Sequence, residues 1–146
     1  MQAGSEDVKV LGYLGRALSL ELSAVQLYTT QSRLTANWGF DQAAQKLRQE
    51  ALEEMWHVER IVARRLDKGA APNASSLRPG RLGPDLPALL KINQAYEQEL
   101  IQLYQQAVSH CTSKGHKNDQ LFFQQLLQEE QQHAAELGDW LSRLNY

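Results

Sequence analysis

The sequence has 146 residues, which is enough for one domain with a sizeable buried core, and we expect a single domain over residues 1–146. Charged residues make up 22% of the chain and the formal net charge is −2, so it lacks the electrostatic footprint of a protein that binds nucleic acid or an anionic membrane. No apolar run has the length of a membrane span, and the chain does not begin like a signal peptide. The single Cys111 excludes an internal disulfide and any multi-cysteine zinc or rubredoxin-like site. We therefore expect a protein of a reducing compartment, the cytoplasm.

Strong helix formers fill four stretches of the chain, and three breaks separate these stretches. The first and third breaks are short, whereas the middle one is long and lies in the stretch around all four prolines, which cannot continue a helix from its interior. We expect helices over roughly residues 5–37, 41–68, 85–113 and 118–143. Asp41 and either Asn118 or Asp119 are plausible N-caps. The pattern predicts an all-α four-helix bundle with a long crossover connection between helices 2 and 3.

Each predicted helix carries an apolar stripe at the spacing that faces a neighbouring helix, and a glutamate interrupts each stripe. The second and fourth stripes also carry a histidine three residues after the glutamate. The six residues are Glu21, Glu54, His57, Glu97, Glu130 and His133. A buried glutamate costs several kcal/mol unless its charge is compensated, so four of them require a common cause. Two divalent ions supply one, and oxygen and imidazole ligands without thiolates suit iron or manganese better than structural zinc.

The six residues also form an internal repeat. A shift of 76 residues superposes the first three of them on the last three, and Tyr28 on Tyr104. One Glu-x-x-His pair is a weak signal, because such pairs are common on solvated helix faces. Two copies in register predict a two-fold site built from two helix pairs. For Tyr28 and Tyr104 we favour a core-filling role, with the hydroxyl bonded to a carboxylate, over electron transfer.

One Glu from each of two helices, with Glu-x-x-His from each of the other two, is typical of ferritin-like di-iron proteins. More specifically, the chain resembles a bacterioferritin in four segments, LSLELSAVQLY at 18–28, NWG at 37–39, LEEMWHVER at 52–60 and LQEEQQH at 127–133. The resemblance covers most of the chain except its first few residues and its end, and implies a ferritin-like four-helix bundle. It also implies catalytic metal ligands for two irons per subunit. In this arrangement the bridging ligands are Glu54 and Glu130, one iron is completed by Glu21 and His57, and the other by Glu97 and His133.

The same resemblance implies a ferroxidase that stores iron. Such proteins oxidise Fe(II) with dioxygen or peroxide and deposit the ferric mineral inside a homo-oligomeric cage. In the family, a methionine at the position of Met55 binds a haem b shared between two subunits of a two-fold dimer. Helical geometry directs Met55 and Trp56 away from the metal, which predicts a subunit interface. A methionine that only fills this interface is the alternative, and Trp56 stands where the family tends to have a polar residue.

The sequence leaves open the size of the cage and alternative functions. Only six residues follow Trp140, so we expect the chain to lack the short fifth helix usual in bacterioferritins, and a cage of 12 subunits is then an alternative to one of 24. The alternative function is a rubrerythrin-like di-iron oxidoreductase or peroxidase without storage, although the chain has no Cys-x-x-Cys module. A helical scaffold with degenerate ligands and a DNA-protecting mini-ferritin fit less well, because all six ligands are present in one chain. His110 and His116 have no counterparts in the repeat, and we expect them to be surface residues.

Overall fold

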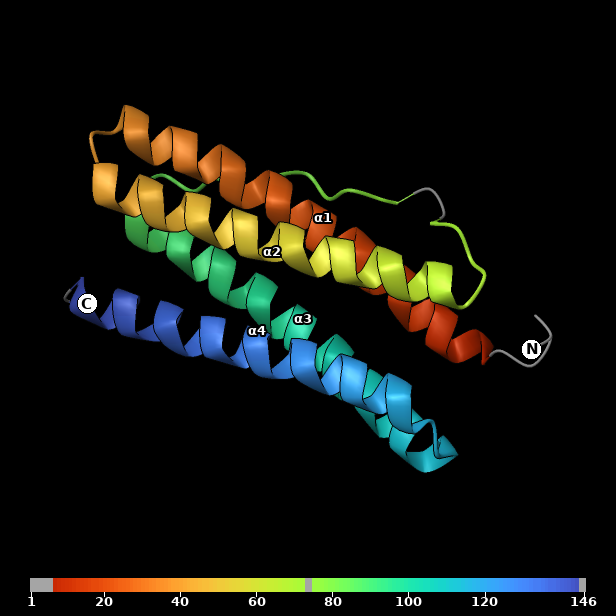
Figure 1. The fold of residues 1–146 in the computed structure, drawn as a ribbon. Coiled ribbons are helices and arrows are strands. Elements are labelled where there is room, and N and C mark those ends of the chain that lie inside the picture. Colours follow the sequence, from red (N-terminus) through yellow and green to blue (C-terminus); the bar gives the residue numbers. More distant parts are fainter. Residues whose placement is uncertain (1–6, 73–74, 145–146) are drawn as a thin grey trace. The chain divides into compact units, whose positions relative to one another are not determined.

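The computed structural model of the protein describes residues 7–72 and 75–144. It contains the helices α1 (Val8–Asn37), α2 (Asp41–Asp67), α3 (Leu86–Lys114) and α4 (Lys117–Arg143), and these described residues form no strand (Figure 1). The predicted all-α architecture is confirmed. The helix boundaries differ from the expected ones by at most three residues, and the expected start at residue 5 lies outside the described ranges. Within those ranges no helix combines the length and apolar character needed to cross a membrane.

The ends of α3 are fixed by two residues suited to their positions. Asp85 precedes the helix, and its Oδ1 accepts a hydrogen bond of 3.0 Å from the backbone N–H of Ala88. Pro87 falls in the first turn, where the amide it lacks would have no partner within the helix. Gly115 follows the helix with a φ of +71°, the left-handed conformation that glycine adopts without steric cost.

The predicted N-caps of α2 and α4 are wrong. The N-cap residues are Phe40 and His116, and neither side chain makes a capping hydrogen bond. Asp41 and Asp119 lie inside the first helical turns instead. Negative charge is favourable there as well, because the helix dipole places partial positive charge at the N-terminus.

The described residues group into two compact units, which are described separately. The first contains Leu14–Leu82, that is, most of α1, all of α2 and the connection that follows. This connection runs along α1 (Figure 1) and is held there by two serines one helical turn apart. The backbone N–H of Ser76 donates to Oγ of Ser19, and that of Arg78 donates to Oγ of Ser23, both at 3.1 Å.

One buried cation also joins elements of the first unit. Arg65, near the end of α2, is only 5% exposed, and its Nη2 donates to the carbonyl oxygen of Ala71 in the connection at 3.1 Å. Its Nη1 lies against α1 at Gly15, where an added Cβ would be 3.6 Å away. The Arg65 side chain therefore links α2, the connection and α1.

The second unit contains Val8–Tyr13 and the chain from Gly83 onward. Its helices α3 and α4 pack against each other. Tyr104 and Phe123 are fully buried and have ring centroids 6.3 Å apart. Tyr13, from the first turns of α1, packs on Phe123 in an edge-on arrangement, also at 6.3 Å. Large aromatic and aliphatic side chains therefore fill the core of this unit.

We expect the same substitution at two glycines to change the free energy of unfolding in opposite directions. Gly115→Ala should destabilise the protein by about 1 kcal/mol, because alanine resists the left-handed conformation. Gly138→Ala, within α4, should stabilise it by about 0.5–1 kcal/mol, because alanine favours the helix. An added Cβ would meet no described atom within 4 Å at either position. Urea unfolding at one protein concentration measures both, and equal signs would contradict this account.

Candidate metal centre

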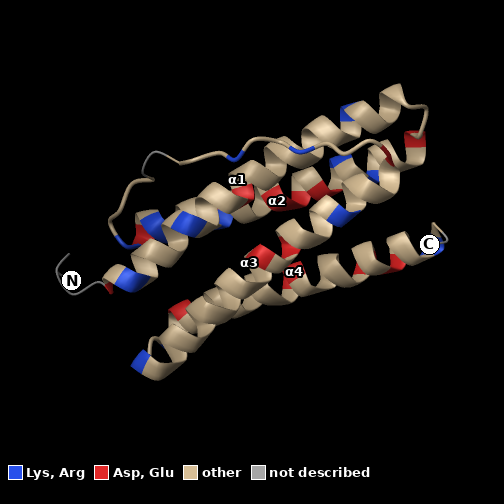
Figure 2. Ribbon diagram, turned by 180° about the vertical axis from the view of Figure 1, so that it is seen from behind, with Lys and Arg blue, Asp and Glu red and all other residues tan. Residues whose placement is uncertain are grey.

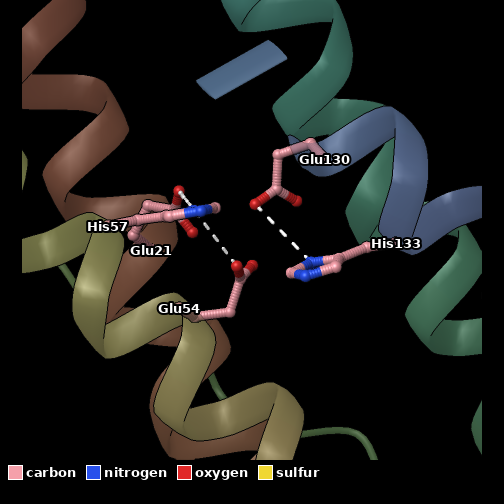
Figure 3. A network of polar contacts seen from close by, with 5 residues as sticks. All are labelled: Glu21, Glu54, His57, Glu130 and His133. Atoms are coloured by element: carbon pink, nitrogen blue, oxygen red, sulfur yellow. Dashed lines mark hydrogen bonds and ion pairs between the residues drawn. The ribbon is translucent and has the colours of Figure 1, made fainter. Parts of the chain in front are cut away.

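The first unit brings together one glutamate of α1 with a glutamate and a histidine of α2 (Figure 3). Glu21 and Glu54 are 0% exposed, and His57 is 1% exposed. Nδ1 of His57 lies 2.8 Å from Oε2 of Glu21 and 3.2 Å from Oε1 of Glu54. The three residues offer ligand atoms that all lie within 4.8 Å of one another. We call Glu21, Glu54 and His57 the first ligand set.

These distances match those between neighbouring ligands on one ion. Two ligands bound at right angles at about 2.1 Å from a metal lie about 3 Å apart. In the tautomer of His57 that carries hydrogen on Nδ1, the 2.8 Å contact is a hydrogen bond from Nδ1–H to Oε2 of Glu21. An ion bound through Nδ1 has to displace this proton, because only a neutral imidazole nitrogen without hydrogen can coordinate.

The second unit contains an equivalent set. Glu97 of α3 is 3% exposed, and Glu130 of α4 is 0% exposed. His133 lies one turn after Glu130, with its Nδ1 4.0 Å from Oε1 of that residue and its side chain 12% exposed. The ligand atoms of these three residues also lie within 4.8 Å of one another. We call Glu97, Glu130 and His133 the second ligand set; two of its members are drawn in Figure 3.

Electrostatics indicates that each ligand set needs a bound cation to offset its negative charge. Acidic residues lie near the middle of α1 and α2, and likewise of α3 and α4 (Figure 2). Within each set two buried carboxylates approach closely, and at an effective dielectric constant of about 20 two such charges repel by roughly 3 kcal/mol. Desolvation of each carboxylate adds to this cost. One divalent cation per set would cancel both charges, and carboxylate oxygens with one imidazole suit ferrous iron.

The other residues considered from the sequence do not extend the ligand sets. Tyr28 and Tyr104 are 1% and 0% exposed, which agrees with the core-filling role. Cys111 is buried and forms no disulfide. His110 and His116 are half-buried rather than fully exposed, and their ring centroids are 6.4 Å apart. No sequence pattern indicated this approach of the two rings, because it depends on how the turn between α3 and α4 folds.

The outward face of α2 carries unusually exposed apolar side chains. Leu52, Met55 and Trp56 are 54%, 40% and 61% exposed, although large apolar residues are normally buried. They follow one another at positions i, i+3 and i+4, so they share one helix face. This is the direction predicted for Met55 and Trp56. The thioether of Met55 is accessible to a ligand or a second subunit.

Comparison with known proteins agrees with this geometry. A profile of the ferritin-like domain family matches residues 11–146. Bacterioferritin from Rhodobacter capsulatus is 35% identical over 136 residues, which cover 93% of this chain and 84% of that protein. Bacterioferritin from Brucella melitensis is 31% identical over 138 residues, which cover 94% and 86%.

A solved structure of the Rhodobacter capsulatus bacterioferritin superposes with a TM-score of 0.90 at 34% sequence identity, over 94% of this chain and 86% of that one. It is described as having a metal-free dinuclear site and a haem iron in a crystallographic special position. The match confirms the ferritin-like four-helix bundle predicted from the sequence. The chain therefore belongs to the ferritin-like family, and its relatives there include the bacterioferritins.

Proposed function

We propose that this protein is an iron-storing ferroxidase, which oxidises Fe(II) to Fe(III) with dioxygen or peroxide and deposits the mineral in an oligomeric cage. One observation carries the proposal. A chain of the ferritin-like family contains two buried ligand sets of the same composition, each with two carboxylates and one imidazole. A fold without a metal substrate would gain stability from apolar residues at these positions.

The two ligand sets act together on a pair of iron ions. In the arrangement that the family resemblance implies, Glu54 and Glu130 would be shared by the two ions, Glu21 and His57 would complete the site of one iron, and Glu97 and His133 would complete the other. Charge supports this assignment, since four carboxylates balance two ferrous ions. The internal repeat supports it as well, because each half of the chain supplies the same three ligand types.

The chemistry needs both irons. Two ferrous ions together give up two electrons, which suffice to reduce dioxygen to the level of hydrogen peroxide, or hydrogen peroxide to water. The protein binds and orients the pair and excludes bulk water, because five of the six ligands are at most 3% exposed. In the tautomer with hydrogen on Nδ1, His57 would also release this proton when an ion binds.

The outward apolar face of α2 supplies the contact between subunits. Burying Leu52, Met55 and Trp56 against a second copy removes apolar surface from water. The exposed Met55 thioether would hold a haem b shared by two such subunits, and a bound haem would supply one-electron transfer. Storage then follows from closed assembly of these dimers into a cage of 12 or 24 subunits.

Replacing a bridging glutamate tests the iron site. Glu54→Ala or Glu130→Ala should slow rapid Fe(II) oxidation by at least about 100-fold, because loss of a metal ligand costs at least as much as loss of an outer-shell partner. Stopped-flow absorbance of ferric products measures this rate. The adjacent half-buried Glu53 and Glu129 give matched controls, and their alanine variants should oxidise iron at nearly the wild-type rate. Unchanged kinetics in Glu54→Ala and Glu130→Ala would refute the assignment.

A second substitution tests the haem. Met55→Leu keeps the apolar volume but removes the thioether, so haem absorbance of the purified protein should disappear while Fe(II) oxidation persists. Retention of haem in the variant would mean that another residue is the axial ligand. Wild-type protein reconstituted with haem is the control, and failure of that protein to bind haem would leave Met55 as an interface residue only.

Particle mass tests storage. A cage of 12 or 24 chains of 16.5 kDa has a mass of about 200 or about 400 kDa. Analytical ultracentrifugation should find one of these species, with the mineral inside after iron loading. A stable monomer or an isolated dimer would exclude storage and favour the rubrerythrin-like alternative.

A further inference from the structure

The turn between α3 and α4 brings two histidines together that are six positions apart in the sequence. After α3, the backbone N–H of His116 donates to the carbonyl oxygen of Cys111 at 2.9 Å. The backbone N–H of Gly115 donates to the carbonyl oxygen of Thr112 at 3.3 Å. This pair of bonds, with Gly115 in the left-handed conformation, folds the chain back over the last turn of α3. His116 therefore lies beside His110, with the ring centroids 6.4 Å apart and the ring planes inclined by 55°.

His110 is itself held in place by aromatic packing within the same unit. The ring of Tyr13 lies 5.9 Å from that of His110, and Tyr13 packs edge-on against the buried Phe123. Both imidazoles are half-buried, so each is ordered by its surroundings and still reachable from solvent. Two imidazoles in this situation are the usual starting point of a surface chelate for a transition metal.

We propose that His110 and His116 form a second metal site, separate from the buried ligand sets, for a divalent ion of the later first-row transition metals such as Cu(II) or Zn(II). An ion about 2.0–2.1 Å from an imidazole nitrogen lies about 3.2 Å from the ring centre, so two rings on one tetrahedral ion have centres about 5–5.5 Å apart. The two rings have to approach by about 1 Å, which small side-chain rotations of half-buried residues allow. Water completes the coordination.

The charged residues beside the two histidines favour Cu(II) and Zn(II) over Mg(II) and Ca(II). Lys114 and Lys117 flank the turn and are exposed, so the local positive charge disfavours ions held mainly by charge, such as Mg(II) or Ca(II). Cu(II) and Zn(II) gain more from imidazole nitrogen and tolerate nearby ammonium groups better. The site is therefore selective through ligand type, unlike the carboxylate-rich ligand sets.

The test titrates the assembled, chelator-treated protein with Cu(II) and counts bound ions per chain by calorimetry. We expect His116→Gln and His110→Gln to bind one fewer ion per chain than the wild type at micromolar Cu(II). The affinity at this site should fall at least as much as the roughly 10–100-fold that loss of an outer-shell partner costs. Electron paramagnetic resonance of the lost site should show coupling to two imidazole nitrogens.

The controls separate this site from the iron site. His116→Gln should oxidise Fe(II) at the wild-type rate and assemble normally, because neither histidine belongs to the ligand sets. Glu130→Gln should lose ions from the buried sets and keep the two-nitrogen signal. Unchanged stoichiometry in both histidine variants would overturn the proposal, and so would a signal from one imidazole only.

Discussion

Buried negative charge inside a helical protein is the constraint on which the rest of this structure depends. Glu21, Glu54 and Glu130 are 0% exposed and Glu97 is 3% exposed, at positions where the neighbouring stripe residues are leucine, isoleucine or tyrosine. Without a cation each ligand set carries both the desolvation of two carboxylates and their mutual repulsion. The long apolar stripes on either side supply the stability that offsets this cost. The protein thus gives up packing energy at these buried positions, and the proposed binding of ions would recover free energy there.

Much of the fold and most of the site could be predicted from the sequence. Helix composition, the proline-rich connection and the apolar stripes predicted the four helices to within a few residues. The clustering of the candidate ligand residues was predictable because a glutamate in an apolar stripe conflicts with burial, and the 76-residue repeat makes a chance conflict improbable. Both signals are local or periodic, so they need no knowledge of tertiary contacts. The same reasoning predicted that Met55 faces outward.

Features that depend on the path of the backbone through a turn were not predictable. Asp41 and Asp119 look like N-caps, but the chain enters α2 and α4 one to three residues earlier, through Phe40 and His116. Capping competes with the geometry of a short interhelical turn, and composition does not reveal which prevails. The approach of His110 to His116 was missed for the same reason, since it follows from the hydrogen bonds that close the end of α3. The hydrogen bonds that Ser19 and Ser23 accept from the connection likewise join residues more than 50 positions apart.

The placement of Arg65 has a consequence for how this sequence can diverge. Its guanidinium lies between the end of α2, the connection and α1, and its Nη1 is 3.6 Å from the position that a Cβ at residue 15 would take. Alanine at position 15 would fit at ordinary contact distance, whereas a longer side chain that extends toward Arg65 would meet the guanidinium. Substitutions at the two positions are therefore coupled. Among related chains, bulky residues at position 15 should occur together with short ones at position 65, and this covariation should be readable from sequences alone.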